Sequence, residues 1–287
     1  MATTINLRPS PIVGQWYPDD EGRLAASVDQ YLDAATLPKI PGKVLGVVAP
    51  HAGHIYSGPV AGYAFAAVRG MKPDIVAVVS PMHQPYLQPV LTSAHDAYYT
   101  PLGIIPVDRE AVQQLNEHLM NQAGFGMTPI YRDREHSLEI ELPFLQRALA
   151  KEFSLLPVMA HDQRPEILQS LGVSLAQVLK GRRFLLVAST DLSHFYPQDQ
   201  AERFDREMLR RIESFDPEAV LKAEEERRGF ACGRGAVAAT FWAARKLGAN
   251  RVRVLHYATS GDITGDYHQV VGYGAAVITK SVNAAYI

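Results

Sequence analysis

The sequence predicts an α/β fold: one domain over residues 1–287, with a mostly parallel or mixed central sheet flanked by helices. Short apolar runs of the kind found in buried parallel strands alternate with amphipathic segments along the chain. Three of these runs, VLGVVAPH, DIVAVVSPMH and FLLVASTDLSH, end in a polar break that contains a histidine. No low-complexity linker, fixed-period repeat or composition shift marks a domain boundary.

The predicted elements alternate between helix and strand. The first is a helix over residues 21–35, in which Leu24, Val28 and Leu32 form one apolar stripe. Further helices are predicted near residues 58–69, 108–121, 137–150, 165–180, 201–213 and 232–248. Strands are predicted at residues 44–49, 74–80, 86–92, 153–160, 184–190, 251–258 and 270–279. Pro143 predicts a displaced or kinked start for the helix that contains it. Alternation of this kind favours a single layered α/β structure.

Composition excludes several classes of protein. The 287 residues are 47% hydrophobic and 20% charged, as in an ordinary globular protein. The net charge of -2, without a basic block, argues against a nucleic-acid groove or a membrane-binding patch. The N-terminal residues lack a signal-peptide core, and no run approaches the roughly 18 apolar residues of a membrane span. A single cysteine excludes an internal disulfide framework and suits a reducing cytosol, so we expect a cytoplasmic protein.

Histidines after separate strands predict a functional site. Ligands of open α/β sheets bind beyond the carboxyl ends of the strands, so His51, His83 and His194 are expected at one edge. Imidazole is both a common metal ligand and a proton carrier. Ser57, shortly after His51, could cap the following helix. Taken alone, His51, like His54, is more simply explained as a solvent-exposed turn residue, and the loop of His83 also suits a plain turn.

Two further residues extend this candidate site. Asp191 lies three residues before His194, where a carboxylate can fix the tautomer of an imidazole and raise its basicity. The alternative is that Asp191 or Ser193 is a helix cap and His194 a surface residue. Cys232 lies at the start of a predicted helix beside Arg234, and both features favour the thiolate. A buried, inert thiol is equally compatible with the sequence.

The segment REHSLEIELPFL adds His136, Glu139 and Glu141, of which His136 and Glu139 are spaced to share one helix face. They could support the site from behind the ligands, but a solvated helix N-terminus with favourable acidic residues explains them equally well. The remaining histidines are assigned structural or surface roles. Among these, His256 and His268 flank a Gly/Asp-rich loop at the same edge of the sheet.

Together these segments resemble the MEMO family, including the bacterial and archaeal proteins called AmmeMemoRadiSam system protein B. The matching stretches run in order across nearly the whole chain: RPSPIVGQWYPDD, APHAGHIYSGPVAGYAF, VVSPMH, EHSLEIELPFLQ, STDLSHF and ACGRGAV. The resemblance implies one MEMO-like domain with a fold similar to that of class III extradiol dioxygenases. Those non-haem iron enzymes bind Fe(II) through two histidines and a glutamate, which leaves positions open for substrate and O2.

The resemblance also implies a metal site. His51 and His83 match the two histidine ligands, and Cys232 falls where MEMO proteins place a cysteine instead of the dioxygenase glutamate. Fe(II) is the expected metal, with copper or zinc as alternatives, because a thiolate shifts metal preference and redox potential. Gln84 departs from the family, whose members usually carry a second histidine at this position.

The resemblance assigns the other site residues as follows. His194 matches the acid/base histidine of the dioxygenases, with Asp191 beside it. Trp16 and Tyr56 match aromatic residues that line the MEMO cleft. Partner proteins of the AMMECR1 and radical-SAM types are implied by the family name alone.

Three functions are compatible with these residues. The first is a metal-dependent, dioxygenase-like oxidoreductase acting on a small molecule of unknown identity. The second is a non-enzymatic module that binds a peptide or a phosphotyrosine-like group in the same cleft. The third is a metal-dependent hydrolase with an activated water. The absence of an arginine or lysine cluster next to the proposed ligands counts against a dedicated phosphate site.

Overall fold

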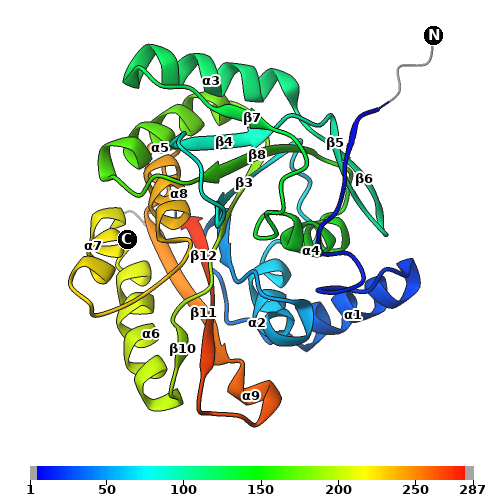
Figure 1. Cartoon of the computed structure of the whole chain (residues 1–287), viewed down its shortest axis with the longest axis vertical. Coiled ribbons are helices and arrows are strands. Elements are labelled where there is room, and N and C mark those ends of the chain that lie inside the picture. The colour runs from blue at the N-terminus through cyan, green and yellow to red at the C-terminus, as the bar shows by residue number, and fades with distance from the viewer. Residues whose placement is uncertain (1–4, 282–287) are drawn as a thin grey trace, which may run out of the picture.

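The computed structural model describes residues 5–281. A mixed nine-stranded sheet lies at the centre of the described structure (Figure 1). Its strands lie in the order β10, β12, β2, β9, β3, β8, β4 and β7, with β11 paired to β12. Their bounds are β2 Lys43–Ala49, β3 Ile75–Pro81, β4 Val90–Ser93, β7 Thr128–Ile130, β8 Ser154–Ala160, β9 Phe184–Ser189, β10 His194–Tyr196, β11 Arg251–Thr259 and β12 Val270–Lys280. A smaller sheet joins β1 Leu7–Arg8, β5 Ala97–Thr100 and β6 Gly103–Pro106. The predicted mixed α/β architecture is confirmed.

Helices cover both faces of the large sheet (Figure 1). One face is covered by α3 Arg109–Ala123, α5 Pro165–Leu179, α6 Gln198–Glu213, α7 Pro217–Glu225 and α8 Arg234–Lys246. The other face is covered by α1 Glu21–Ala34, α2 His54–Ala66 and α4 Leu142–Ala148. Two short elements complete the set, the 3-10 helix η1 Glu139–Glu141 and the helix α9 Gly261–Thr264. Each layer buries its own hydrophobic cluster against the sheet.

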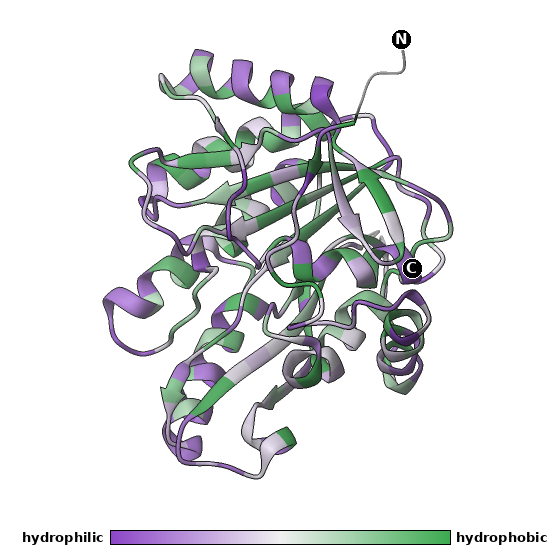
Figure 2. Ribbon diagram, turned by 45° about the vertical axis from the view of Figure 1, so that its right-hand side comes forward, coloured by the Kyte–Doolittle hydropathy of each residue, from purple (hydrophilic) through white to green (hydrophobic). Residues whose placement is uncertain are grey.

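The central strands are apolar on both sides because both sides are covered. In β3, Ile75, Ala77 and Val79 belong to the cluster under α5 and α8. Val76 and Val78, which point the opposite way, belong to the cluster under α1 and α2. Figure 2 shows hydrophobic colour along the central strands and hydrophilic residues on the outward turns of the helices. This packing holds the strand ends rigidly.

Four neighbouring strands carry the candidate site. β2, β9, β3 and β8 are mutually parallel along the sheet. Their carboxyl ends therefore meet at one edge, and the segments after β2, β3 and β9 lie next to one another there. This arrangement brings His51 next to Asp191, 140 positions later in the chain.

Most of the predicted elements are present, with shifted boundaries. The helix predicted near residues 58–69 begins at His54, so Ser57 lies inside it and donates its hydroxyl to the Ala52 carbonyl instead of capping the helix. The offset predicted from Pro143 is observed, because η1 precedes α4 and the proline lies in the first turn of α4. Within residues 5–281, no helix is long and apolar enough to span a membrane.

Candidate metal centre

Three histidines converge at the carboxyl edge of the sheet. His51 follows β2, His83 follows β3, and His136 lies in the loop before η1. Each offers a ring nitrogen, and these three atoms lie within 4.8 Å of one another. The rings of His83 and His136 stack at 4.8 Å, and the ring of His51 meets both edge-on. Such a cluster is a candidate metal centre.

Hydrogen bonds behind His51 fix its tautomer. Its Nδ1 lies 2.9 Å from the Ser189 hydroxyl oxygen. That hydroxyl lies 2.6 Å from the Ser137 carbonyl and 2.7 Å from Glu141 Oε1, so its single hydrogen is directed to one of these oxygens. The Ser189 oxygen then accepts the Nδ1 hydrogen of His51. Nε2 of His51 consequently keeps its lone pair.

Glu135 holds the other two histidines. Its Oε1 accepts from His83 Nδ1 at 2.9 Å and from the His136 backbone N–H at 2.9 Å. Its Oε2 accepts from the His83 backbone N–H at 2.6 Å. These contacts keep the Glu135 carboxyl ionised, and its pKa lies far below the ordinary value despite burial. Nε2 of His83 is therefore left free, as in many metal sites where a carboxylate orients the ligand.

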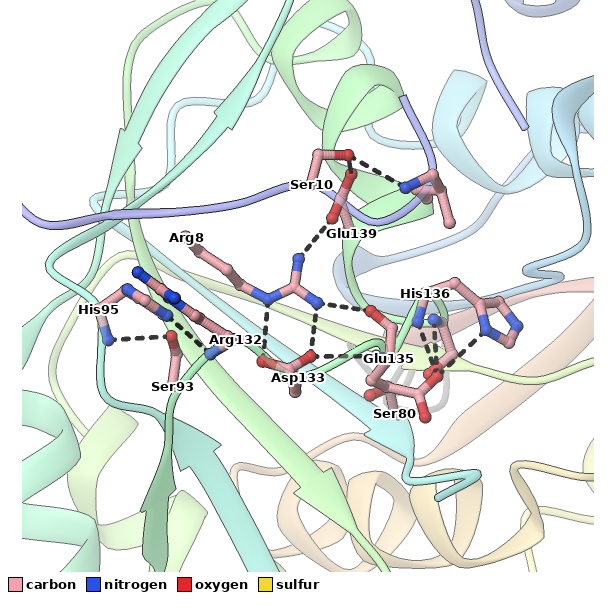
Figure 3. A network of polar contacts seen from close by, with 12 residues as sticks. Arg8, Ser10, Ser80, Ser93, His95, Arg132, Asp133, Glu135, His136 and Glu139 are labelled. Atoms are coloured by element: carbon pink, nitrogen blue, oxygen red, sulfur yellow. Dashed lines mark hydrogen bonds and ion pairs between the residues drawn. The ribbon is translucent and has the colours of Figure 1, made fainter. Parts of the chain in front are cut away.

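A buried ionic network anchors the loop that carries Glu135 (Figure 3). The Arg8 guanidinium, from β1, forms hydrogen bonds to Asp133, to Glu139 and to the Glu135 carbonyl. Arg8, Asp133 and Glu139 are all at most 5% exposed. Tyr17 donates its hydroxyl to Glu139 at 2.6 Å. Glu139 thus faces this network, and the predicted shared helix face with His136 is wrong because the chain forms a loop and a 3-10 turn there.

Cys232 contacts the cluster through His51. Its Sγ lies 3.0 Å from His51 Nε2 and accepts the Asp191 backbone N–H at 3.3 Å. Burial, followed by the charge of Asp191, raises the pKa of the Cys232 thiol well above its ordinary value. Of the two states that the sequence left open, the thiol is therefore favoured over the thiolate, and Arg234 pairs with Glu224. The three-histidine group does not include Cys232.

Asp191 and His194 both line the cleft but have different partners. Asp191 Oδ1 accepts the His51 backbone N–H at 2.8 Å, and its Oδ2 lies 3.9 Å from His51 Nε2. Asp191 therefore bonds to the backbone of His51, whereas the sequence predicted that it would fix the tautomer of His194. Burial raises the pKa of Asp191 to about 7. Burial also lowers the pKa of His194, which begins β10 and pairs with Val271. His194 is therefore neutral near pH 7.

The histidines form the base of a cleft of about 700 Å³. Trp16 packs against His136 with ring centroids 4.3 Å apart, and Tyr56 lines the cleft with 42% of its surface exposed. Phe195, which the sequence reading missed, is another aromatic wall residue and is 67% exposed. No lysine or arginine occurs among the described residues that line this cleft. Gln84 is not part of the lining either.

His136 belongs to the three-histidine group, although the sequence offered it only as a supporting residue or a helix start. It follows no strand, and its position depends on the long-range bonds of Glu135 and Arg8. The only available signal was the density of polar residues in REHSLEIE, which the sequence reading divided between a supporting role and a helix start. His256, in contrast, stacks on Tyr63 with ring centroids 4.1 Å apart and is not among the described residues that line the cleft.

The donor atoms fit a transition-metal ion. Two nitrogens bound at about 2.1 Å cannot be more than about 4.2 Å apart, so the 4.8 Å span requires only a small closure by side-chain rotation. Cys232 Sγ is close enough to His51 Nε2 for both to bind one ion, since cis ligands at these bond lengths lie about 3 Å apart. The site is thus chemically suited to iron, copper or zinc.

Comparisons with known proteins bear on the family and the fold of this chain. Residues 8–277 match the family model described as Memo-like protein. A MEMO1 family protein of Nitrosopumilus maritimus is 33% identical over 273 residues, covering 94% of this chain and 98% of that protein. A MEMO1 family protein of Thermotoga maritima is 34% identical over 282 residues, covering 94% and 99%. The solved structure of an uncharacterized protein, JW3007, from Escherichia coli K12 shares the fold, with a TM-score of 0.54, 11% identity and coverage of 82% and 100%.

Proposed function

This chain belongs to the Memo-like protein family, and on that premise we propose that its cleft is the site of a metal-dependent, dioxygenase-like oxidoreductase. Non-haem iron is the proposed metal. The observation that carries the proposal is the convergence of His51, His83 and His136 at the base of an open cleft. When bound, the metal supplies Lewis acidity and electron exchange at its open positions.

The residues around the metal ligands have separate tasks. Glu135 and Ser189 hold the imidazoles with Nε2 available. His194, neutral near pH 7, accepts a proton from a substrate in the cleft. Asp191 is proposed as the second proton-carrying group, and a cation on the histidines would lower its pKa from about 7.

The cleft walls favour a flat, uncharged or weakly charged small molecule. Trp16, Tyr56 and Phe195 offer aromatic faces, and such rings stack on planar groups. Because no lysine or arginine lines the described part of the cleft, a phosphotyrosine-like ligand would find no cationic partner there. This observation disfavours the phosphopeptide-binding module.

The second candidate is a metal hydrolase. Three neutral imidazoles form the donor set of catalytic zinc sites in which the fourth position carries water. A metal held by the three histidines without Cys232 would favour this alternative, because an anionic ligand would then be missing. Metal identity decides between the two functions.

The test is elemental analysis of protein purified without oxygen. We expect about one iron per chain in the wild type and loss of most of it in His51→Ala. His136→Ala and Cys232→Ser identify the third ligand, because only a true ligand is needed for full occupancy. Nitric oxide then probes for open positions on the ferrous site. Zinc in place of iron would support the hydrolase, and a metal-free protein would contradict both enzymatic functions.

His194→Ala is the matched control for these variants. We expect it to keep the metal, since His194 is outside the three-histidine group, and to lose about 10²–10⁴-fold in rate once a substrate is found. Metal loss in this variant would make His194 a ligand and refute the assigned proton-transfer role.

A further inference from the structure

A second cavity lies at the opposite end of the sheet from the histidine cleft. It has a volume of about 830 Å³ and includes Lys43 and Phe184, the first residues of β2 and β9. The histidine cleft lies beyond the other ends of the same two strands. The two cavities share no lining residue, so conclusions about one are independent of the other.

The charge of this cavity is one-sided. Its described lining contains six cationic side chains and no carboxylate: Lys43, Lys180, Arg182, Arg183, Lys246 and Lys280. Arg182 pairs with Asp108, and Arg183 pairs with Asp74. Over residues 5–281 the four lysines form no ion pair. This concentration of cations occurs in a chain whose net charge is -2.

Helix termini account for only part of the charge. Lys180 caps the C-terminus of α5, and Lys246 ends α8, where the partial negative charge of a helix end favours cations. Lys43 and Lys280 have no such explanation. They lie directly opposite each other on the antiparallel strands β2 and β12, an arrangement in which like charges are destabilising.

The Lys280 side chain extends over the end of α8. A Cβ at Gly248, which has a φ of +94°, would lie 2.8 Å from Lys280 Nζ. The glycine thus leaves room for this ammonium group beside the helix end. The two strand lysines and the two helix-end lysines consequently surround one cavity.

Apart from Gln177, the remaining side chains of the lining are apolar. Leu45, Val173, Ala176, Phe184 and Leu247 offer a surface for an uncharged or aromatic group between the cations. The volume is within the usual range for sites that bind small molecules. Together, the surface and the charges suit a ligand with an apolar body and several negative charges.

We propose that this cavity binds an organic polyphosphate, with two or more phosphate groups on an apolar or aromatic body, as in a nucleoside diphosphate. The phosphates contact Lys43, Lys280 and Lys246, and the body packs on Phe184 and Leu247. Binding relieves the repulsion between Lys43 and Lys280, so the ligand also stabilises the fold.

The test is calorimetric titration of the full chain with ADP at low salt. EDTA is included so that phosphate cannot bridge to a metal in the histidine cleft. We expect saturable binding, tighter than that of inorganic pyrophosphate because pyrophosphate lacks the apolar body, and weakened by added salt. The double variant K43Q/K280Q should lose about tenfold or more in affinity.

The matched control is K39Q/K72Q, which removes two exposed lysines outside the cavity lining. We expect its affinity for ADP to equal that of the wild type. Equal weakening in both double variants would show that only net charge matters and would overturn the site. No ADP binding at low salt, or pyrophosphate binding as tightly as ADP, would also overturn the proposal. K246Q provides an independent variant should K43Q/K280Q fail to fold.

Discussion

Ser189 and Glu141 explain at the level of single residues why His51 presents Nε2 to the cleft. Ser189 accepts from His51 Nδ1, and Glu141 is bonded to Ser189 from behind. Glu141 is fully buried, and its Oε2 has no partner among the described residues. Burial raises the pKa of this carboxyl well above the ordinary value. Its hydrogen bond to Ser189 indicates that Glu141 holds Ser189 in place and, through Ser189, positions His51.

Ser189→Ala should therefore weaken metal binding by about 10–100-fold, because His51 loses the group that fixes its tautomer. Metal affinity is measured by competition with a chelator of known affinity. Ser174→Ala is the control, as Ser174 is also fully buried but lies in α5 away from the cluster. Equal affinities in Ser189→Ala and wild type would refute the positioning role.

Phe195 combines strained backbone with an exposed ring at the cleft. Its φ is 61°, in the left-handed region that disfavours side chains with a Cβ, and 67% of its surface is exposed. We expect Phe195→Gly to be more stable than Phe195→Ala by about 1 kcal/mol, since both lose the ring but only glycine relieves the strain. Chemical denaturation measures the difference. An alanine variant as stable as the glycine variant would show that the backbone is unstrained.

At the scale of elements, the hydrogen bonds of Arg8 link β1 to the loop that carries Glu135 and His136. Arg8→Ala leaves the carboxylates of Asp133 and Glu139 buried without their cation. We expect the free energy of unfolding to fall by about 3–5 kcal/mol. Metal affinity should fall as well, because the Glu135 carbonyl also accepts from Arg8.

The control for Arg8→Ala is Arg23→Ala, which removes an exposed pair with Asp19 and should change the free energy of unfolding by less than about 1 kcal/mol. Urea denaturation distinguishes the two variants. A small decrease in the free energy of unfolding of Arg8→Ala would mean that water solvates the two carboxylates in place of the arginine.

The sequence predicted the parts of the fold that depend on local patterns. The apolar runs of β2, β3 and β9 predicted the strands of the sheet. Because ligands of such sheets bind beyond the carboxyl ends of the strands, His51 and His83 were expected at one edge, where they lie. Short pieces such as β1 and β10 were missed because two or three residues show no periodicity. The sequence left the role of His136 open for a related reason: tertiary contacts of Arg8 and Glu135 set its position.

At the scale of the molecule, the two ends of the parallel strands carry opposite chemistry. The carboxyl ends gather imidazoles and the carboxyl groups of Glu135 and Asp191, which suit a cation. The amino ends gather lysines, which suit an anion. The apolar strands between them form a rigid spacer of buried residues. Ligands at the two ends can therefore both stabilise the same sheet.

Buried histidines should make the stability of the whole molecule depend on pH. His54 is 3% exposed, packs on Phe144 and bonds to the Ile140 carbonyl through Nε2. Burial lowers its pKa to about 4, from 6.5 in the unfolded chain. Between these values the unfolded chain binds the proton more strongly. The contribution of His54 to stability is therefore complete above pH 6.5 and is lost as the pH falls toward 4.

The size of this contribution is about 3 kcal/mol, from 1.36 kcal/mol per pKa unit. Asp191, whose pKa is raised to about 7, acts in the opposite direction, so the pH profile of the wild type alone does not isolate His54. The difference in the free energy of unfolding between wild type and His54→Gln does isolate His54, because Asp191 is present in both proteins. We expect the stability advantage of the wild type over His54→Gln to shrink by about 3 kcal/mol between pH 7.5 and pH 4. His268→Gln, at an exposed position, serves as the control. A pH-independent difference for His54→Gln would show that His54 titrates alike in the folded and unfolded chains.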